Sequence, residues 1–169
     1  MMASSPMDIP IFYINLASDT QRRQCMEAEL QRLKLDGQRI DAIRWTALPE
    51  AEQATLYSDA LNERQFYVPL VAGEKGCYAS HLLAWRQLLQ RGDKAMVVLE
   101  DDVRFDDRLP AVLAAIARLD QPWDMIKLIG REQEKIRSQR KLVDGVMLVE
   151  YARVPSLTEI GRASCRERV

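Results

Sequence analysis

The chain has 169 residues, enough for one domain with a hydrophobic core. Apolar residues make up 47% and charged residues 29%, which is ordinary usage for a soluble globular protein. The formal net charge of -1 gives no electrostatic basis for binding nucleic acid or an anionic membrane, and no apolar run reaches the roughly 20 residues of a transmembrane helix.

The N-terminal sequence, MMASSPMDIP, has no basic stretch followed by an apolar run, so we expect no signal peptide. The three cysteines, Cys25, Cys77 and Cys165, lie far apart and form no C-x-x-C pair. We therefore expect neither a disulfide framework nor a cysteine zinc site, and a cytoplasmic location fits, with a peripheral contact at the inner membrane left open.

The first part of the chain predicts a strand, a tight turn and a helix. Residues 11–16 (IFYINL) are rich in β-branched and aromatic residues and predict a buried strand. Ser18 and Gln21 match a capping box with Ser18 as the N-cap. Apolar residues recur at helical spacing after it, and Gly37 follows the expected end of the helix.

The middle of the chain predicts a second strand and a long helix. Residues 39–45 favour the strand, and residues 48–67 favour short helices or an ordered loop. Residues 69–76 (PLVAGEKG) contain two glycines and predict a loop. Residues 77–91 carry a helical apolar face, and Gly92 is a suitable stop.

The rest of the chain adds strands and one more helix. Residues 95–99 (AMVVL) form the clearest strand pattern, and Pro110 opens a helix over residues 111–119. Residues 125–129 and 146–151 predict strands, while the charged residues 131–141 predict an exposed loop or a solvated helix. The alternation favours a single α/β domain with a mostly parallel sheet flanked by helices.

Three carboxylates, Glu100, Asp101 and Asp102, follow the clearest strand. If the strand persists, alternation places Glu100 and Asp102 on one side and Asp101 on the other. Ligands of open α/β sheets collect outside the carboxyl ends of the strands, and clustered carboxylates repel unless a cation lies among them. We therefore predict that Glu100 and Asp102 bind Mg²⁺ or Mn²⁺, which neutralises a diphosphate leaving group. A solvated acidic turn is the alternative.

Three blocks in the chain resemble glycosyltransferase family 25, whose members build outer cores of lipopolysaccharide and lipooligosaccharide. They are IFYINLASDTQRRQCM, GEKGCYASHLLAW and VVLEDDVRF, and the later PWDMIKLIG is similar to the family's next strand. The resemblance covers residues 9 to 130 in order. It implies a GT-A-like, Rossmann-type nucleotide-sugar domain that performs an inverting transfer, usually of galactose from UDP-galactose, to a saccharide acceptor of lipopolysaccharide or lipooligosaccharide.

The resemblance also implies roles for individual residues. Asn15 and Leu16 are expected beside the nucleotide, and Arg22 and Arg23 on the diphosphate, since guanidinium matches phosphate geometry. Ser80 and His81 lie early in a helix, where backbone N–H groups attract anions, and Glu74 lies in a glycine-flanked loop that can reach substrate. The alternative for Arg22 and Arg23 is a solvated helix face. For His81 it is a structural histidine packed against the sheet, and for Glu74 it is simple surface exposure.

The proton acceptor of an inverting transfer needs a carboxylate opposite the leaving group. Asp101 is the candidate in this chain, and a base from sequence beyond it is the alternative.

Family members continue past the point where this chain stops, so we interpret residues 1–157 as an incomplete, N-terminal domain truncated at its C-terminus. Residues 158–169 (TEIGRASCRERV) do not resemble the family's continuation, and we interpret them as a tail foreign to the native gene. Exposed apolar surface on a truncated sheet would favour association, so we expect homodimers or aggregates.

Two other functions remain open. One is a truncated, catalytically inactive module that only binds a nucleotide-sugar. The other is a receiver-like Mg²⁺-binding α/β domain, against which the ending of the first strand in Asn15 and Leu16 argues.

Overall fold

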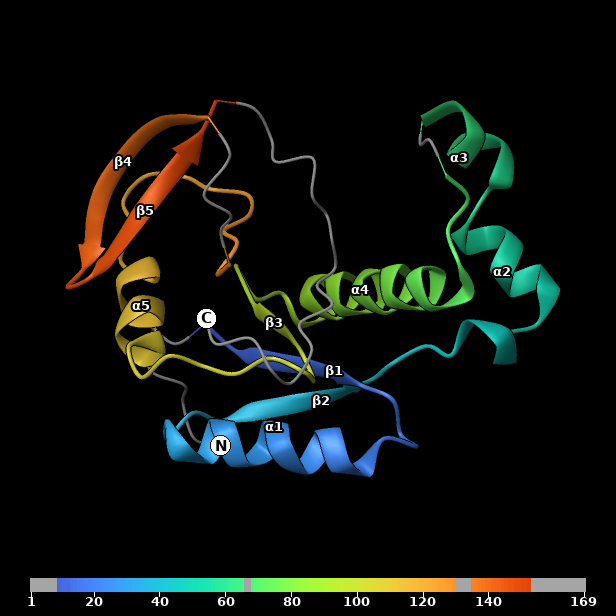
Figure 1. The fold of residues 1–169 in the computed structure, drawn as a ribbon, viewed down its shortest axis with the longest axis horizontal. Coiled ribbons are helices and arrows are strands. Elements are labelled where there is room, and N and C mark those ends of the chain that lie inside the picture. Colours follow the sequence, from blue (N-terminus) through green and yellow to red (C-terminus); the bar gives the residue numbers. More distant parts are fainter. Residues whose placement is uncertain (1–8, 66–67, 130–134, 153–169) are drawn as a thin grey trace.

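A computed structural model describes residues 9–65, 68–129 and 135–152. The expected tail at residues 158–169 lies outside these ranges. Within them, the strands form a parallel sheet in the order β2-β1-β3 and a separate antiparallel hairpin, β4-β5. None of the helices in this part of the chain has the length and apolar character needed to cross a bilayer. Figure 1 shows the parallel sheet between two helices, with the hairpin to one side.

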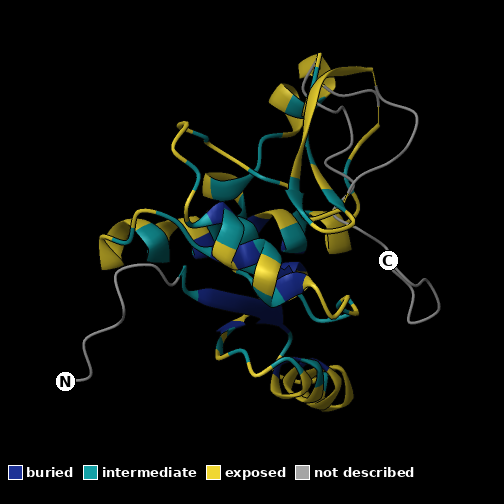
Figure 2. Ribbon diagram, turned by 90° about the vertical axis from the view of Figure 1, so that its left-hand side faces the viewer, coloured by how far each residue is buried: buried dark blue, intermediate teal, exposed yellow. Residues whose placement is uncertain are grey.

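β1 (Ile11–Asn15) is the central strand and is buried along its whole length, as its run of apolar residues predicts. It pairs in parallel with β2 (Gly37–Asp41) on one edge and β3 (Val97–Glu100) on the other. In Figure 2 the central strand is accordingly dark blue, with helices on either side of it. The expected strand at residues 39–45 therefore starts earlier and ends earlier, because the chain turns into a short 3-10 helix, η1 (Trp45–Ala47).

α1 (Thr20–Arg32) covers one face of the sheet. Its Met26 and Leu30 pack against Ile11 and Tyr13, and α5 (Leu109–Ile116) completes that side. The N-cap is Asp19 rather than Ser18, because the Asp19 carboxylate accepts the backbone N–H of Arg22 at 3.2 Å.

The end of α1 also differs from the prediction. The helix stops at Arg32, and Lys34 adopts a positive φ of 55° in the turn that follows. Gly37 lies inside β2 as its first residue and therefore does not cap the helix.

α4 (Ala72–Arg91) covers the opposite face, where Ala84 packs with Phe12, Ile14 and Ile40. It ends at Gly92, whose φ of 70° is the left-handed conformation expected of a helix stop. The predicted loop at residues 69–76 is wrong from residue 72 onward. The helix begins there because the Glu74 carboxylate accepts the backbone N–H of Val71 at 2.8 Å and caps the first turn.

Two short helices, α2 (Glu50–Leu56) and α3 (Asp59–Gln65), precede α4, as the pattern allowed. The helix predicted at residues 111–119 is α5, with its proline near the start. The strand expected at residues 125–129 is absent from the described structure. Met125 is 63% exposed and Ile129 is 50% exposed. No strand forms in this described segment because residues of β-favouring composition form a strand only where another strand pairs with them.

β5 (Val146–Tyr151) confirms the last predicted strand. Its partner β4 (Ile136–Val143) lies where we expected a loop or a solvated helix. Asp144 and Gly145 connect the two strands, and Gly145 has a φ of 73°. An Asp-Gly pair between apolar residues predicts a β-hairpin. The sequence therefore contained a signal for this hairpin, although the many charged residues of the segment favoured a loop or a solvated helix.

Candidate functional site

The strand order reverses at β1, because the strands that follow β1 in the chain are added on opposite sides of it. The chain first builds β2 on one side of β1 and then β3 on the other side. In open α/β sheets such a reversal leaves a crevice outside the carboxyl ends of the two strands concerned. Those ends are Asn15 on β1 and Glu100 on β3, where Glu100 lies in register with Ile14.

A cavity of about 440 Å³ lies at this place. Its walls come from the ends of β1 and β3, the start of α1, the segment after β2 and the first turns of α4. The residues with predicted site roles that line it are Asn15, Leu16, Arg22, Ser80, Glu100 and Asp101. The tertiary structure thus brings together groups that are up to 86 residues apart in the chain.

Asn15 connects the two strand ends. Its side chain is 1% exposed, and its Nδ2 donates to Asp101 Oδ2 at 2.6 Å and to the backbone oxygen of Asp19 at 3.1 Å. Its Oδ1 is buried and has no hydrogen-bond partner among the described residues. A buried amide oxygen in this state is an acceptor available to a ligand.

The three carboxylates divide between two groups of partners. Asp101 Oδ1 accepts from Arg22 Nη1 at 3.3 Å, and Asp102 Oδ2 lies 3.9 Å from the same nitrogen. Glu100 instead faces α4. The alternation that we expected therefore holds for Glu100 and Asp101 but does not continue to Asp102, because β3 ends at Glu100 and the chain turns.

Asp102 is a largely buried carboxylate, and one of its oxygens is unpaired within the described part of the chain. Its side chain is only 13% exposed, and its Oδ1 has no hydrogen-bond partner among the described residues. Burial raises the pKa of Asp102, and the nearby charge of Glu100 raises it further, while Arg22 acts in the opposite direction. A buried carboxylate oxygen without a donor, next to further carboxylates, fits a hard divalent cation.

On the other side of β3, Glu100 meets two side chains of α4. His81 Nε2 lies 3.3 Å from Glu100 Oε1, and Cys77 Sγ lies 3.7 Å from the same oxygen. Burial, followed by the charge of Glu100, raises the pKa of the Cys77 thiol to about 12. The thiol is therefore protonated at neutral pH in the absence of a metal.

Ser80 holds the wall of the cavity together. It is 1% exposed, and its hydroxyl accepts the backbone N–H of Ile43 at 2.8 Å and donates to the Gly76 oxygen at 2.7 Å. Gly76 also belongs to this contact, since a Cβ at that position would lie 2.6 Å from the Ile43 oxygen. These contacts tie α4 to the segment after β2, so the structure gives Ser80 a packing role in addition to its place in the wall.

Four residues with predicted roles do not line the cavity: Arg23, Glu74, His81 and Asp102. His81 and Asp102 contact lining residues, as described above. Arg23 pairs with Glu27 at 2.8 Å, and Glu74 caps α4, so the structure does not bring either side chain to the expected diphosphate. The helical face of α1 turns Arg23 away while it presents Arg22.

The segment after β2 contributes residues that had no predicted role in the site. Arg44 and Trp45 line the cavity, and Arg44 Nη2 donates to Ser18 Oγ at 2.8 Å. Lys75 lies 3.9 Å from the Tyr57 ring and 5.7 Å from the Trp45 ring, which orders this wall. The available signal was position: this segment follows the carboxyl end of a strand adjacent to β1.

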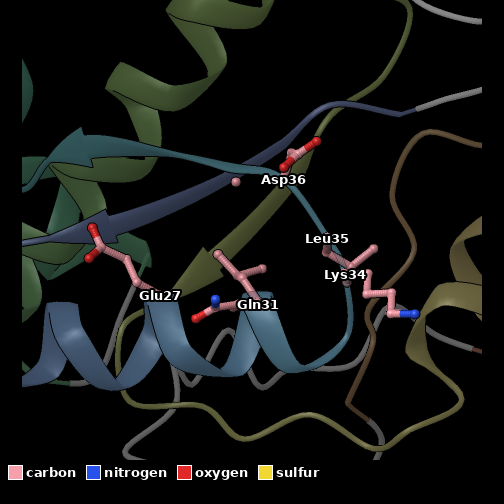
Figure 3. Close-up of a pocket in the computed structure, with 7 residues that line it drawn as sticks. Glu27, Gln31, Lys34, Leu35 and Asp36 are labelled. Atoms are coloured by element: carbon pink, nitrogen blue, oxygen red, sulfur yellow. The ribbon is translucent and has the colours of Figure 1, made fainter.

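A second cavity, of about 480 Å³, lies between the end of α1 and the beginning of β2, with Glu27, Lys34 and Asp36 at its edge (Figure 3). It lies at the amino end of β2, at the opposite end of the strands from Glu100, Asp101 and Asp102. Most residues with predicted site roles therefore line the cavity at the carboxyl ends of β1 and β3 and not this second cavity.

The chain is similar to known proteins over most of its length. The family model described as "Glycosyltransferase family 25 (LPS biosynthesis protein)" matches residues 8–154. Procollagen galactosyltransferase 1-B of Xenopus laevis is 33% identical to 80% of this chain. Procollagen galactosyltransferase 2 of Mus musculus is 30% identical to 83% of it.

The matches also include a protein named for lacking activity, inactive glycosyltransferase 25 family member 3 of Mus musculus, which is 35% identical to 73% of this chain. The chain spans only 22% to 24% of the lengths of these relatives.

Proposed function

This chain belongs to glycosyltransferase family 25, and from that premise we propose that it is the nucleotide-sugar-binding part of a hexosyltransferase. The donor is a UDP-sugar, with galactose as the hexose, and the acceptor is a saccharide of the lipopolysaccharide type. The names of the relatives support galactose as the sugar. The family description supports the lipopolysaccharide-type acceptor, whereas these relatives are named for procollagen. A three-stranded parallel sheet flanked by helices is compatible with a Rossmann-like, GT-A-type domain.

One observation carries the proposal. Asp101, Asp102 and Arg22 meet at the carboxyl ends of β1 and β3, beside a cavity of about 440 Å³. Carboxylates for a cation and a guanidinium for phosphate are the two components that bind a metal–diphosphate. Both occur where the topology of the sheet leaves a ligand crevice.

Within this cavity, the residues of the chain divide the work of holding the donor. Arg22 and Arg44 line the cavity and would contact the diphosphate, and the free Oδ1 of Asn15 would accept a donor hydroxyl or N–H. Glu100 and Asp102 face different partners in this structure, so one carboxylate would have to turn toward the other for both to hold Mn²⁺ or Mg²⁺. The ion would neutralise charge on the leaving diphosphate.

Asp101 is less suited to accept a proton from the acceptor hydroxyl. Both of its carboxylate oxygens already accept hydrogen bonds, one from Asn15 and one from Arg22. We therefore propose that Asp101 orients Arg22 and Asn15. The proton acceptor of the transfer then lies elsewhere.

The proposal is tested by thermal denaturation with UDP, UDP-galactose or GDP, each with and without Mn²⁺. A ligand at 100 times its Kd stabilises the folded state by about 2.7 kcal/mol, which corresponds to roughly 5–10 °C in a domain of this size. We expect that shift for the uridine ligands with Mn²⁺. Asp102→Asn should remove the Mn²⁺-dependent part.

Asp144→Asn is the matched control, since it makes the same chemical change at a side chain 97% exposed in the hairpin turn. It should respond like the parent chain. Equal responses of the Asp102→Asn variant and the parent would refute the metal assignment.

The second candidate is a binding module without turnover. The observation in its favour is the similarity to inactive glycosyltransferase 25 family member 3. Release of galactose from UDP-galactose, or its transfer to a saccharide, separates the two candidates. Mn²⁺-dependent binding with neither reaction would identify the module.

A further inference from the structure

Cys77, His81 and Glu100 form a compact group of three different metal-ligating side chains. Cys77 Sγ, His81 Nε2 and a Glu100 carboxylate oxygen all lie within 4.8 Å of one another. All three residues are partly buried, and His81 and Glu100 side chains are 24% and 25% exposed. We propose that this group is a binding site for Zn²⁺ or a chemically similar transition-metal ion, separate from the hard-ion role of Asp102.

The backbone explains why these side chains converge. Cys77 and His81 are four residues apart in α4, so they project from the same face of the helix. That face packs on the side of the sheet toward which Glu100 points at the end of β3. Rigid elements therefore supply all three ligands.

The distances match a tetrahedral ion. With zinc–sulfur, zinc–nitrogen and zinc–oxygen bonds of about 2.3, 2.05 and 2.1 Å, tetrahedral geometry needs sulfur–oxygen and nitrogen–oxygen separations of about 3.6 and 3.4 Å. The structure has 3.7 Å between Cys77 Sγ and Glu100 Oε1, and 3.3 Å between His81 Nε2 and the same oxygen. Tetrahedral geometry needs a sulfur–nitrogen separation of about 3.6 Å. Cys77 Sγ and His81 Nε2 lie within 4.8 Å of each other, so this pair needs to draw closer by at most about 1.2 Å.

The ligand types select the metal. Mg²⁺ requires oxygen ligands, whereas a thiolate and an imidazole favour Zn²⁺ and related ions. Binding displaces the thiol proton of Cys77 to solvent, so the ion bonds to a thiolate. A C-x-x-C search misses this site because it has one cysteine and its third ligand lies 19 residues beyond His81.

The coordination would be incomplete on the protein side. Three protein ligands leave a fourth tetrahedral position, as in zinc sites that bind water or substrate. Cys77 and Glu100 both line the cavity, so that position opens toward it. An ion here also engages Glu100, which we assigned to the donor's metal, and it would therefore compete with that metal for the carboxylate.

The test is a Co²⁺ titration without nucleotide, in a chain carrying Cys25→Ser and Cys165→Ser so that only Cys77 remains. We expect one equivalent of tetrahedral Co²⁺, with visible d–d bands and a near-ultraviolet thiolate-to-cobalt band, both lost on adding Zn²⁺ but not Mg²⁺. Adding Cys77→Ser should abolish the thiolate band. His81→Gln should weaken Zn²⁺ binding by more than the roughly 10–100-fold typical of losing an outer-shell partner.

Far-ultraviolet circular dichroism checks that each variant is folded. Glu100→Gln removes the third ligand with little change in side-chain shape. Asp102→Asn should keep the thiolate band, which separates failure of this site from failure of the donor site. An octahedral Co²⁺ spectrum in the parent chain, or a thiolate band that persists after Cys77→Ser, would overturn the proposal.

Discussion

Adding one methyl group at Gly76 should destabilise the protein, whereas the same change three residues earlier should not. A Cβ on Gly76 would lie 2.6 Å from the backbone oxygen of Ile43 and 3.4 Å from the backbone nitrogen of Trp45. Backbone atoms in this position cannot rotate away, so α4 and the segment after β2 must separate. A Cβ on Gly73 meets nothing within 4 Å.

The expected magnitudes follow from these contacts. Overpacking of this kind costs about 1–3 kcal/mol. The displaced oxygen belongs to Ile43, whose backbone N–H donates a hydrogen bond to Ser80 Oγ. A helical Gly→Ala change without a clash stabilises by about 0.5–1 kcal/mol. Because Gly76→Ala gains the same helix propensity, its net cost is up to about 2.5 kcal/mol and it should lower Tm by up to roughly 10 °C. Gly73→Ala should raise Tm by up to about 4 °C.

Thermal and urea denaturation followed by circular dichroism at the helix band would measure both variants. Because both glycines lie in the first turns of α4, their helix propensities are matched and the difference isolates the contact with Ile43. A Gly76→Ala chain that melts as high as the Gly73→Ala chain would refute the close approach of α4 to this segment.

Three further predictions concern single side chains of the site. Ser80→Ala should cost about 1–3 kcal/mol by leaving the Ile43 N–H buried without an acceptor, and a urea midpoint equal to the parent's would disprove that role. Asp102→Asn should raise Tm near neutral pH without metal. The folded-state pKa of Asp102 is raised above its ordinary 3.8, so ionisation of Asp102 destabilises the folded parent chain as pH rises above 3.8. The Tm advantage of Asp102→Asn over the parent should therefore disappear below pH 3.8, where the carboxyl group is protonated in both the folded and the unfolded chain. An unchanged gap at acid pH would contradict this. Cys77, with a thiol pKa of about 12, should resist iodoacetamide at pH 8 in a Cys165→Ser chain while exposed Cys25 reacts, and mass spectrometry of the alkylated peptides would detect the reverse order.

The core of the fold was predictable because local chemistry decides it. The apolar run of β1 is buried on both faces, which is typical of a central parallel strand. The run of β3 is buried on one face and partly buried on the other, at the edge of the sheet. The helix stop at Gly92 likewise follows from a conformation that glycine adopts without strain.

The errors occurred where a distant or competing group decides the local structure. Residues 72–76 contain two glycines and suggested a loop, but Glu74 caps the helix, and the helix needs Gly76 because it touches Ile43. Residues 125–129 have strand composition, yet they form no ladder in the described structure, since a strand needs a partner.

The site shows the same division. The sequence by itself determined which groups are present: an acidic triplet after a buried strand, arginines early in a helix, and a Cys77–His81 pair one helical turn apart. Only the tertiary structure decided their partners, because contacts across 79 residues, such as Arg22 with Asp101, depend on the order of strands in the sheet. That order put Asp101 and Asp102 beside Arg22 and turned Glu100 toward α4. It also brought in Arg44, which no local pattern marks, since the end of β2 lies next to β1 only once the sheet has formed.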